Sequence, residues 1–146
     1  MVAFVKINGF VEHVATKQHD LAANQMTIAL SNTAPASETP NPTVLTADAI
    51  LANVTTIALT NISTSPNVTT TSAVQSGGLF DLVLVDLTLT ATGVVPTFQY
   101  VYVYNSTTAS NFLIGMWDHG SAVNMVNGST YEINFDTTGN KLLSLQ

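Results

Sequence analysis

The chain has 146 residues, a length typical of one domain with its own hydrophobic core, and we expect a single domain over residues 1–146. Only 8% of the residues are charged, and the net charge is −6 because nine acidic residues face three lysines and no arginine. This balance argues against nucleic-acid and anionic-membrane partners, which need clustered cations, and the lack of cysteine excludes disulfides and thiolate chemistry.

Thr, Asn and Ser together make up 46 of the 146 residues and replace charged residues as the polar component. Uncharged, often β-branched side chains favour a pleated sheet and disfavour long solvated helices. The first residues lack the apolar run of a signal peptide, and the most apolar stretch, residues 79–89, contains two aspartates and is too short to span a bilayer. We therefore expect a soluble β protein made in the cytoplasm.

The amino-terminal part predicts a helix, a turn and a strand. Apolar residues at helical spacing indicate a short amphipathic helix within residues 3–15, namely Phe4, Ile7, Val11 and Val14. Gly9 weakens this helix, and a strand is the alternative. Residues 17–20 are typical of a turn, and residues 25–31 alternate as a half-buried strand whose buried face is Met26, Ile28 and Leu30.

The next part is polar and weakly patterned. Residues 32–42 contain three of the five prolines and predict a surface loop. Residues 46–51 favour one helical turn capped by Thr46, and residues 55–60 favour a strand that buries two apolar side chains, Ile57 and Leu59. Residues 61–76 predict either an exposed edge strand or a mobile loop.

The second half alternates more clearly. Residues 79–90 predict one long strand, buried on both faces around residues 82–85 and then turning Leu87 and Leu89 inward. Pro96 is expected to open the next strand, an acceptable place for a residue without an N–H. On that strand, four aromatic residues are expected to share one face, namely Phe98, Tyr100, Tyr102 and Tyr104.

Strands are also expected at residues 112–118 and 122–126. The dipeptide Asn127-Gly128 predicts a hairpin that leads into a strand at residues 130–136. A turn at residues 138–140 precedes a last strand at residues 142–145. Eight or nine short strands predict a mainly β fold, an antiparallel β-sandwich or jelly-roll-like barrel, with one or two short helices near the amino terminus.

Catalytic and metal-binding patterns are weak. Asp118-His119-Gly120 offers an acid beside an imidazole, but adjacent strand residues point to opposite faces, so a turn with a half-exposed histidine is the preferred interpretation. His13, His19 and Asp20 match no zinc spacing and favour a solvated turn. Asp81 and Asp86 are expected on opposite faces of one strand, where they cannot share a cation. We expect no catalytic residue, no metal and no cofactor.

The aromatic row, Phe98, Tyr100, Tyr102 and Tyr104, is the candidate interface. Aromatic rows on strands stack sugars or anchor protein contacts, and the alternative is that the rings line the core with their hydroxyls at its rim.

Three amino-terminal segments and three carboxy-terminal ones resemble a group of small virion proteins of tailed bacteriophages: residues 19–21, 26–35 and 46–53, then 98–105, 113–121 and 127–136. The resemblance covers most of the chain apart from about residues 63–76. Its most specific part is Ile114-Gly-Met-Trp-Asp-His-Gly-Ser121, where the group typically has an aromatic residue in place of His119. That departure argues against a catalytic His119.

The resemblance implies a non-enzymatic virion component. We expect a capsid decoration (cement) protein on the phage head, made in the host cytoplasm, with the major capsid protein as its partner and a homotrimer as its assembly. One alternative is a tail- or fibre-associated virion protein, including a carbohydrate-binding module. The other is a small hydrolase or lyase that uses Asp118 and His119.

Overall fold

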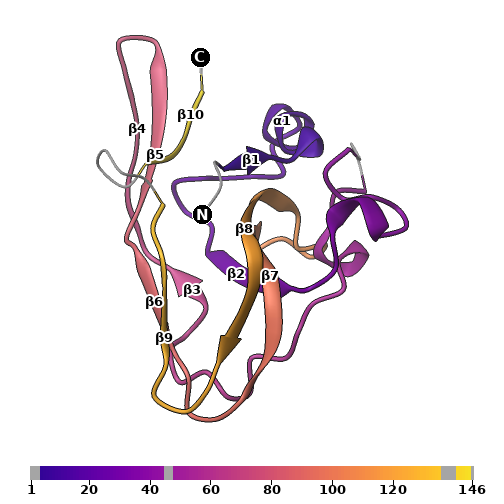
Figure 1. The fold of residues 1–146 in the computed structure, drawn as a ribbon. Helices are drawn as coiled ribbons and strands as arrows, with labels where there is room; N and C mark the ends of the chain where they lie inside the picture. Colours follow the sequence, from indigo (N-terminus) through magenta and orange to yellow (C-terminus); the bar gives the residue numbers. More distant parts are fainter. Residues whose placement is uncertain (1–3, 45–47, 136–140, 146) are drawn as a thin grey trace.

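A computed structural model describes residues 4–44, 48–135 and 141–145. Within these ranges the chain forms ten strands, one α-helix and two short 3₁₀ turns (Figure 1). In chain order the elements are β1 (Val5–Lys6), α1 (Asn8–Ala15), β2 (Met26–Ser31), η1 (Pro35–Ser37), η2 (Leu51–Asn53), β3 (Asn67–Val68), β4 (Thr70–Ser76), β5 (Leu79–Leu84), β6 (Leu87–Thr90), β7 (Val95–Asn105), β8 (Leu113–Met125), β9 (Thr130–Ile133) and β10 (Lys141–Leu145).

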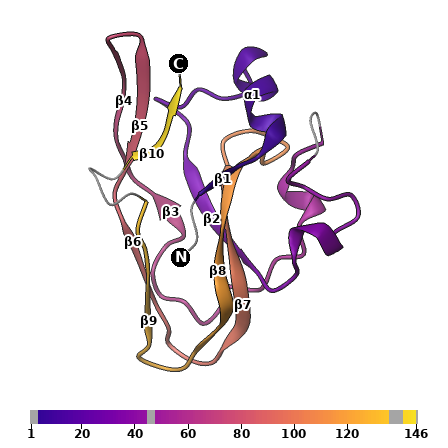
Figure 2. The same cartoon turned by 45° about the horizontal axis from the view of Figure 1, so that its top comes forward.

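The strands form antiparallel sheets in two layers. One layer is a five-stranded sheet with the order β1-β8-β7-β2-β3. The other contains a three-stranded sheet, β10-β5-β4, and the β6-β9 pair, which lie together on one side of the molecule in Figures 1 and 2. The expected fold class, mainly β and sandwich-like with a short amino-terminal helix, is therefore confirmed.

The two layers are joined by one long ribbon that bends. β6 pairs with β9 up to Thr90 opposite Thr130, and β7 pairs with β8 from Val95 opposite Met125 onward. At the corner Ala91 N–H donates to the Ser129 carbonyl at 2.9 Å. The two ladders keep the same register through this corner, so the ribbon runs down one layer and returns up the other (Figure 1).

The predicted hairpin at Asn127-Gly128 is wrong in its pairing. The chain does turn there, Gly128 has φ +83°, and its N–H donates to the Ala91 carbonyl at 2.8 Å. However, β8 pairs with β7 and β9 pairs with β6. In many proteins this dipeptide closes a tight hairpin. In this chain it forms a corner between two layers, because the neighbouring segment Thr90–Val95, which connects β6 to β7, bends beside it.

Two expected strand boundaries are also wrong. The single strand expected at residues 79–90 is two strands, and the break lies at Val85 and Asp86. Leu82 and Leu84 are buried but Val83 is half-buried and Val85 is exposed, so this stretch alternates and is not buried on both faces. Conversely, the two strands expected at residues 112–118 and 122–126 form the continuous strand β8.

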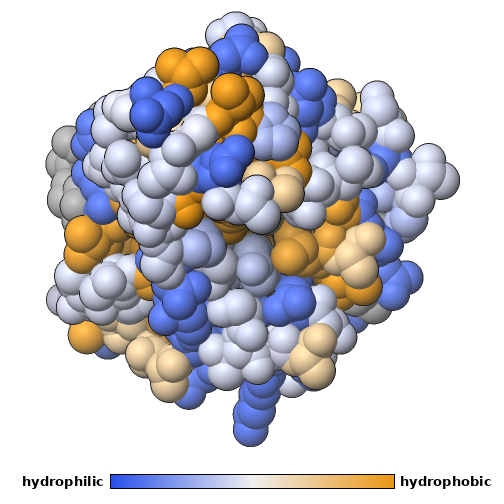
Figure 3. All heavy atoms as spheres, turned by 90° about the horizontal axis from the view of Figure 1, so that it is seen from below, coloured by the Kyte–Doolittle hydropathy of each residue, from blue (hydrophilic) through white to orange (hydrophobic). Residues whose placement is uncertain are grey.

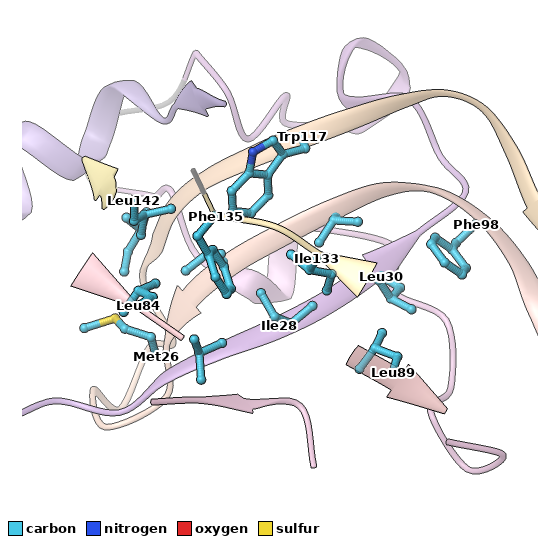
Figure 4. Close-up of a cluster of buried hydrophobic side chains, with 14 of the residues drawn as sticks. Met26, Ile28, Leu30, Leu84, Leu89, Phe98, Trp117, Ile133, Phe135 and Leu142 are labelled. Atoms are coloured by element: carbon cyan, nitrogen blue, oxygen red, sulfur yellow. The ribbon is translucent and has the colours of Figure 1, made fainter. Parts of the chain in front are cut away.

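The main core fills the space between the layers (Figure 4). The five-stranded sheet contributes Met26, Ile28, Leu30 and Trp117 among others, and the opposite layer contributes Leu84, Leu89, Ile133, Phe135 and Leu142. The rings of Trp117 and Phe135 meet with centroids 5.7 Å apart. Burial of these apolar side chains is the main force that holds the sandwich together.

The other face of the five-stranded sheet is also covered. A second cluster packs there, formed by Ile7, Ala29, Ala49, Val54, Tyr100, Tyr102, Leu113 and Met116. All six residues of β2 are consequently buried, which corrects the expectation of a half-buried strand. The cover is supplied by the polar segment between β2 and β3, whose Ala49 and Val54 turn inward.

The amino-terminal segment combines both expected structures. β1 pairs Val5 with Met116, and α1 then begins at Asn8. The buried face of α1 is Gly9, Phe10 and His13, whereas Val11 is exposed, so the expected apolar face is wrong at Val11. The loop at residues 32–42 is confirmed and includes the 3₁₀ turn η1.

The remaining local predictions fare unevenly. Thr46 and the turn at residues 138–140 lie outside the described residues, and the helical structure nearest to residues 46–51 is the 3₁₀ turn η2. Residues 55–60 form one bridge, Ser31 with Thr56, in place of a strand. Within residues 61–76, β3 and β4 are edge strands, as one alternative predicted, whereas residues 61–66 form only an isolated bridge, Ile62 with Ala91. β10 confirms the last strand.

Candidate functional site: buried polar clusters, a neutral surface and the β4 edge

His13 and His19 lie together in the interior. His13 comes from α1 and His19 from the turn that follows it, their ring centroids are 5.8 Å apart, and both are buried. The ring centroids of Phe112 and His13 are 4.0 Å apart. The solvated turn expected for these histidines is therefore wrong, because α1 folds their side chains against the start of β8.

Asn105, at the end of β7, binds this cluster to the sandwich. Its Nδ2 donates to Asn24 Oδ1 at 2.6 Å and lies 3.1 Å from His19 Nδ1, while its Oδ1 accepts from the Thr107 N–H at 3.1 Å. Since the amide oxygen is held by Thr107, Nδ2 is the donor toward the ring and His19 Nδ1 accepts. His19 thus carries its proton on Nε2 and is neutral.

Burial, together with a smaller effect of the neighbouring His13, lowers the pKa of His19 from its ordinary 6.5 to about 4. His19 Nε2 is buried without a hydrogen-bond partner in the described part of the chain. Asp20, the third residue of the histidine-rich pattern, is exposed, and its carboxylate accepts from the Ala22 and Ala23 N–H groups. This arrangement stabilises a neutral structural imidazole and does not present a metal site.

Asp118 and His119 engage different partners. Asp118 Oδ1 accepts from Gln99 Nε2 at 2.9 Å and from the Gly120 N–H at 2.7 Å. The His119 Nδ1 atom lies 3.3 Å from the Tyr131 hydroxyl. The acid and the imidazole thus form no hydrogen-bonded pair, as the alternation along a strand predicts.

The two aspartates of the expected long strand have local structural roles. Asp81 accepts a hydrogen bond from the Ser144 hydroxyl of β10. Asp86 Oδ1 accepts from the Phe135 N–H at 3.0 Å and so fixes the break between β5 and β6. These bonds join β5 and the break to the carboxy-terminal part of the chain.

The aromatic row does not form a surface. Phe98 lies in the main core, edge-on to Tyr131 at 5.1 Å, because register shifts in β7 turn it away from the tyrosines. Tyr100 and Tyr102 lie in the second cluster, and Tyr104 is half-buried against it. The Tyr102 hydroxyl is buried without a hydrogen-bond partner in the described structure, and burial raises its pKa above the usual range. The rings of Phe98, Tyr100 and Tyr102 therefore line the core, as the alternative predicted, and are not accessible as an interface in this chain.

Two hollows lie at the surface near the end of α1. One, of about 500 Å³, lies between the helix end and the β5–β10 region, where apolar side chains, namely Val14, Leu21, Phe80 and Leu145, line it together with Lys17, His19 and Asp20. The other, of about 300 Å³, is lined by residues 22–25, 68–70 and 107, none of them aromatic. The first suits an apolar group, and the second offers amide and hydroxyl groups without a stacking platform.

The outer surface is neutral and hydroxyl-rich. In Figure 3 pale residues of intermediate hydropathy cover much of the face, with small blue and orange patches between them. The larger exposed apolar residues are valines, including Val11 on α1, Val74 on β4, and Val94 and Val126 at the corner. β4 forms the outer edge of its sheet, and Figures 1 and 2 show the β4–β5 hairpin extending from the body as an arm. Sequence patterns located this edge but not the arm.

The described residues contain no group of three or more His, Cys, Asp or Glu side chains that could hold a metal ion. No helix in the part of the chain that the structure describes is long and apolar enough to cross a membrane. Comparisons with protein-family models, with curated proteins and with solved structures found no match for this chain.

Proposed function

We propose that this protein is a non-enzymatic virion component of a tailed phage, a capsid decoration protein that binds the outer face of the head and stabilises it. The observation that carries the proposal is the composition of the surface. The antiparallel sandwich is rich in Thr, Ser and Asn side chains, and only 8% of the residues in the chain are charged. The similarity of several segments to small phage virion proteins supports the same assignment.

Such a surface suits binding to a protein lattice. Hydroxyl and amide groups form hydrogen bonds across an interface at a much lower desolvation cost than buried charges do. The net charge of −6 keeps free copies soluble. Copies that bind only the assembled shell stabilise it by mass action, so the bound lattice is favoured over the bare one. The partner in this proposal is the major capsid protein.

The burial of Phe98, Tyr100 and Tyr102 bears on the alternative of a carbohydrate-binding tail or fibre protein. That alternative depended on exposed aromatic rings on which sugars could stack. With these rings in the interior, a neutral surface that contacts protein is the stronger basis for function.

The test mixes the purified protein with undecorated mature capsids and images the particles. Saturating, symmetric density on the shell and hundreds of copies per virion, measured from quantified protein bands, would support the proposal. A bare shell, or a few copies confined to the tail, would contradict it and support the tail alternative.

Single substitutions would locate the binding face. Four exposed valines, which sample three parts of the surface, are each replaced by glutamate: Val11 on α1, Val74 on β4, and Val94 and Val126 at the corner. If one face contacts the shell, one or two of these variants lose saturation and the others bind as the wild type does. Loss in all four, with folding intact, would contradict a specific face.

The variant His119→Phe separates binding from catalysis. Because the imidazole contacts Tyr131 and not Asp118, we expect this variant to decorate capsids as the wild type does. If the wild type showed hydrolase or lyase activity and His119→Phe lost it, the enzymatic alternative would be supported.

A further inference from the structure

In the part of the chain that the structure describes, β4 is a sheet edge without a covering strand. It pairs with β5 along one side, and no other described strand pairs with it. Sheet edges are commonly protected by charged residues, by proline or by a covering element, and β4 contains no charged residue and no proline. Its only irregularity lies between Thr70 and Ser72, so residues 72–76 form a regular edge.

The turn determines which groups face outward. Gly77 and Gly78 both have positive φ, +62° and +85°, as a two-residue hairpin turn requires, and Ser76 pairs with Leu79 next to it. In such a hairpin the closing pair is hydrogen-bonded and pairs then alternate. The N–H and C=O groups of Ala73 and Gln75 therefore point away from β5, toward the open edge.

We propose that β4 binds β4 of a second copy of this chain, antiparallel and about a two-fold axis at Val74. In this register Ala73 exchanges hydrogen bonds with the partner's Gln75, and Val74 lies opposite the partner's Val74. The two three-stranded sheets then form one continuous six-stranded sheet. A two-fold contact of this kind closes on itself, so it yields a dimer and not the trimer expected from the resemblance.

The edge can pair with itself without charge repulsion and with apolar contact. Val74 is 58% exposed in the single chain, and at a non-hydrogen-bonded position the two valines come closest and cover each other. No like charges meet, because β4 is uncharged. The nearest acid, Asp81, lies opposite Val74 on β5. Two copies of Asp81 would be three strand spacings apart, about 14 Å, which exceeds the screening length of about 8 Å in physiological salt.

The first test measures the mass of the purified full chain by sedimentation and light scattering up to about 1 mM. We expect a concentration-dependent dimer. Val74→Lys places two cations opposite each other, and Gln75→Pro removes an outward N–H without touching the bonds to β5, so each should raise the dissociation constant at least about tenfold. Val11→Lys, the same change at an exposed valine on α1, is the matched control and should dimerise as the wild type does.

The second test uses the absence of cysteine from the chain. Val74→Cys places two thiols at a non-hydrogen-bonded antiparallel pair, within reach of a disulfide, so mild oxidation should give a covalent dimer. Gln75→Cys points to the other face of the sheet, opposite the partner's Ala73, and should not cross-link. Val11→Cys controls for random collisions.

A monomer or a trimer at every concentration would overturn the proposal. Equal cross-linking of the three cysteine variants, or a dimer unaffected by both Val74→Lys and Gln75→Pro in folded protein, would do the same. Binding of β4 by another protein's strand would appear as a wild-type monomer that binds capsids and loses this binding with Gln75→Pro, an outcome that also rejects self-pairing.

Discussion

The Nδ2 atom of Asn105 lies 3.1 Å from Nδ1 of His19, a residue 86 positions earlier in the chain. This contact joins the turn after α1 to the end of β7, in a site where both residues are buried. The buried Asn105 amide also donates to Asn24 and accepts from Thr107, so both its nitrogen and its oxygen have hydrogen-bond partners. The amino-terminal segment is thereby fixed to the sandwich by a specific polar network as well as by apolar packing.

Asn105→Ala should destabilise the protein by about 1–3 kcal/mol, because the buried His19 ring and the half-buried Asn24 amide lose a hydrogen-bond partner. Denaturant unfolding measures the difference from the wild type. Asn134→Ala, at an exposed asparagine, is the control and should change stability by less than about 0.5 kcal/mol. Equal stabilities of the two variants would contradict a role for the network.

Stability should fall on mild acidification because of His19. In the unfolded chain its pKa is near 6.5, whereas in the folded chain it is about 4. Between these values the unfolded state binds more protons, so stability is full above pH 6.5 and is lost as the pH falls toward 4, by up to about 3 kcal/mol. Unfolding free energies measured from pH 7.5 to pH 4 should give this slope.

The variant His19→Gln isolates that slope from the titration of carboxylates. Its stability should depend less on pH between 6.5 and 4 than that of the wild type. Parallel pH profiles for the two proteins would show that His19 does not titrate in this range.

Gly115→Ala should destabilise the β1–β8 pairing. A Cβ atom at Gly115 would overlap the Phe4 ring and lie 2.9 Å from the Val5 carbonyl oxygen. Overpacking of this kind costs about 1–3 kcal/mol. In a Phe4→Ala background the same change should cost less, since the ring is gone, and a double-mutant cycle of unfolding free energies measures the difference. Strict additivity would contradict the steric explanation.

Asp86→Ala should cost about 1–2 kcal/mol, because the N–H of the buried Phe135 loses its acceptor. Asp86→Asn keeps an acceptor oxygen and should recover much of the loss, which thermal or denaturant unfolding resolves. If the asparagine variant were as unstable as the alanine one, the negative charge and not the hydrogen bond would be what matters at this break.

Local patterns predicted the elements better than their partners. Alternation in residues 130–136 correctly indicated the strand β9, and Asn127-Gly128 correctly indicated a turn. The hairpin was still wrong, because β9 pairs with β6 from 40 or so positions earlier and a dipeptide carries no information about that strand.

The histidine cluster shows the same limit for the candidate site. His13 and His19 stand in a polar stretch with Lys17 and Asp20, which is typical of a solvated turn. Their burial depends on Asn105 and Phe112, which approach only once β7 and β8 are in place. The helical spacing of Phe10 and His13 on one face is the signal that could have located His13.

Composition and alternation were enough to predict the β class and the neutral surface, because both act residue by residue along a strand; for residues 61–76 they gave an edge strand only as one of two alternatives. Packing in three dimensions was needed to bury β2 on both faces, to separate β5 and β6 into different sheets, and to place Tyr100 and Tyr102 of β7 inside. Each of these depends on which distant segment covers a strand, and that is settled by packing between segments.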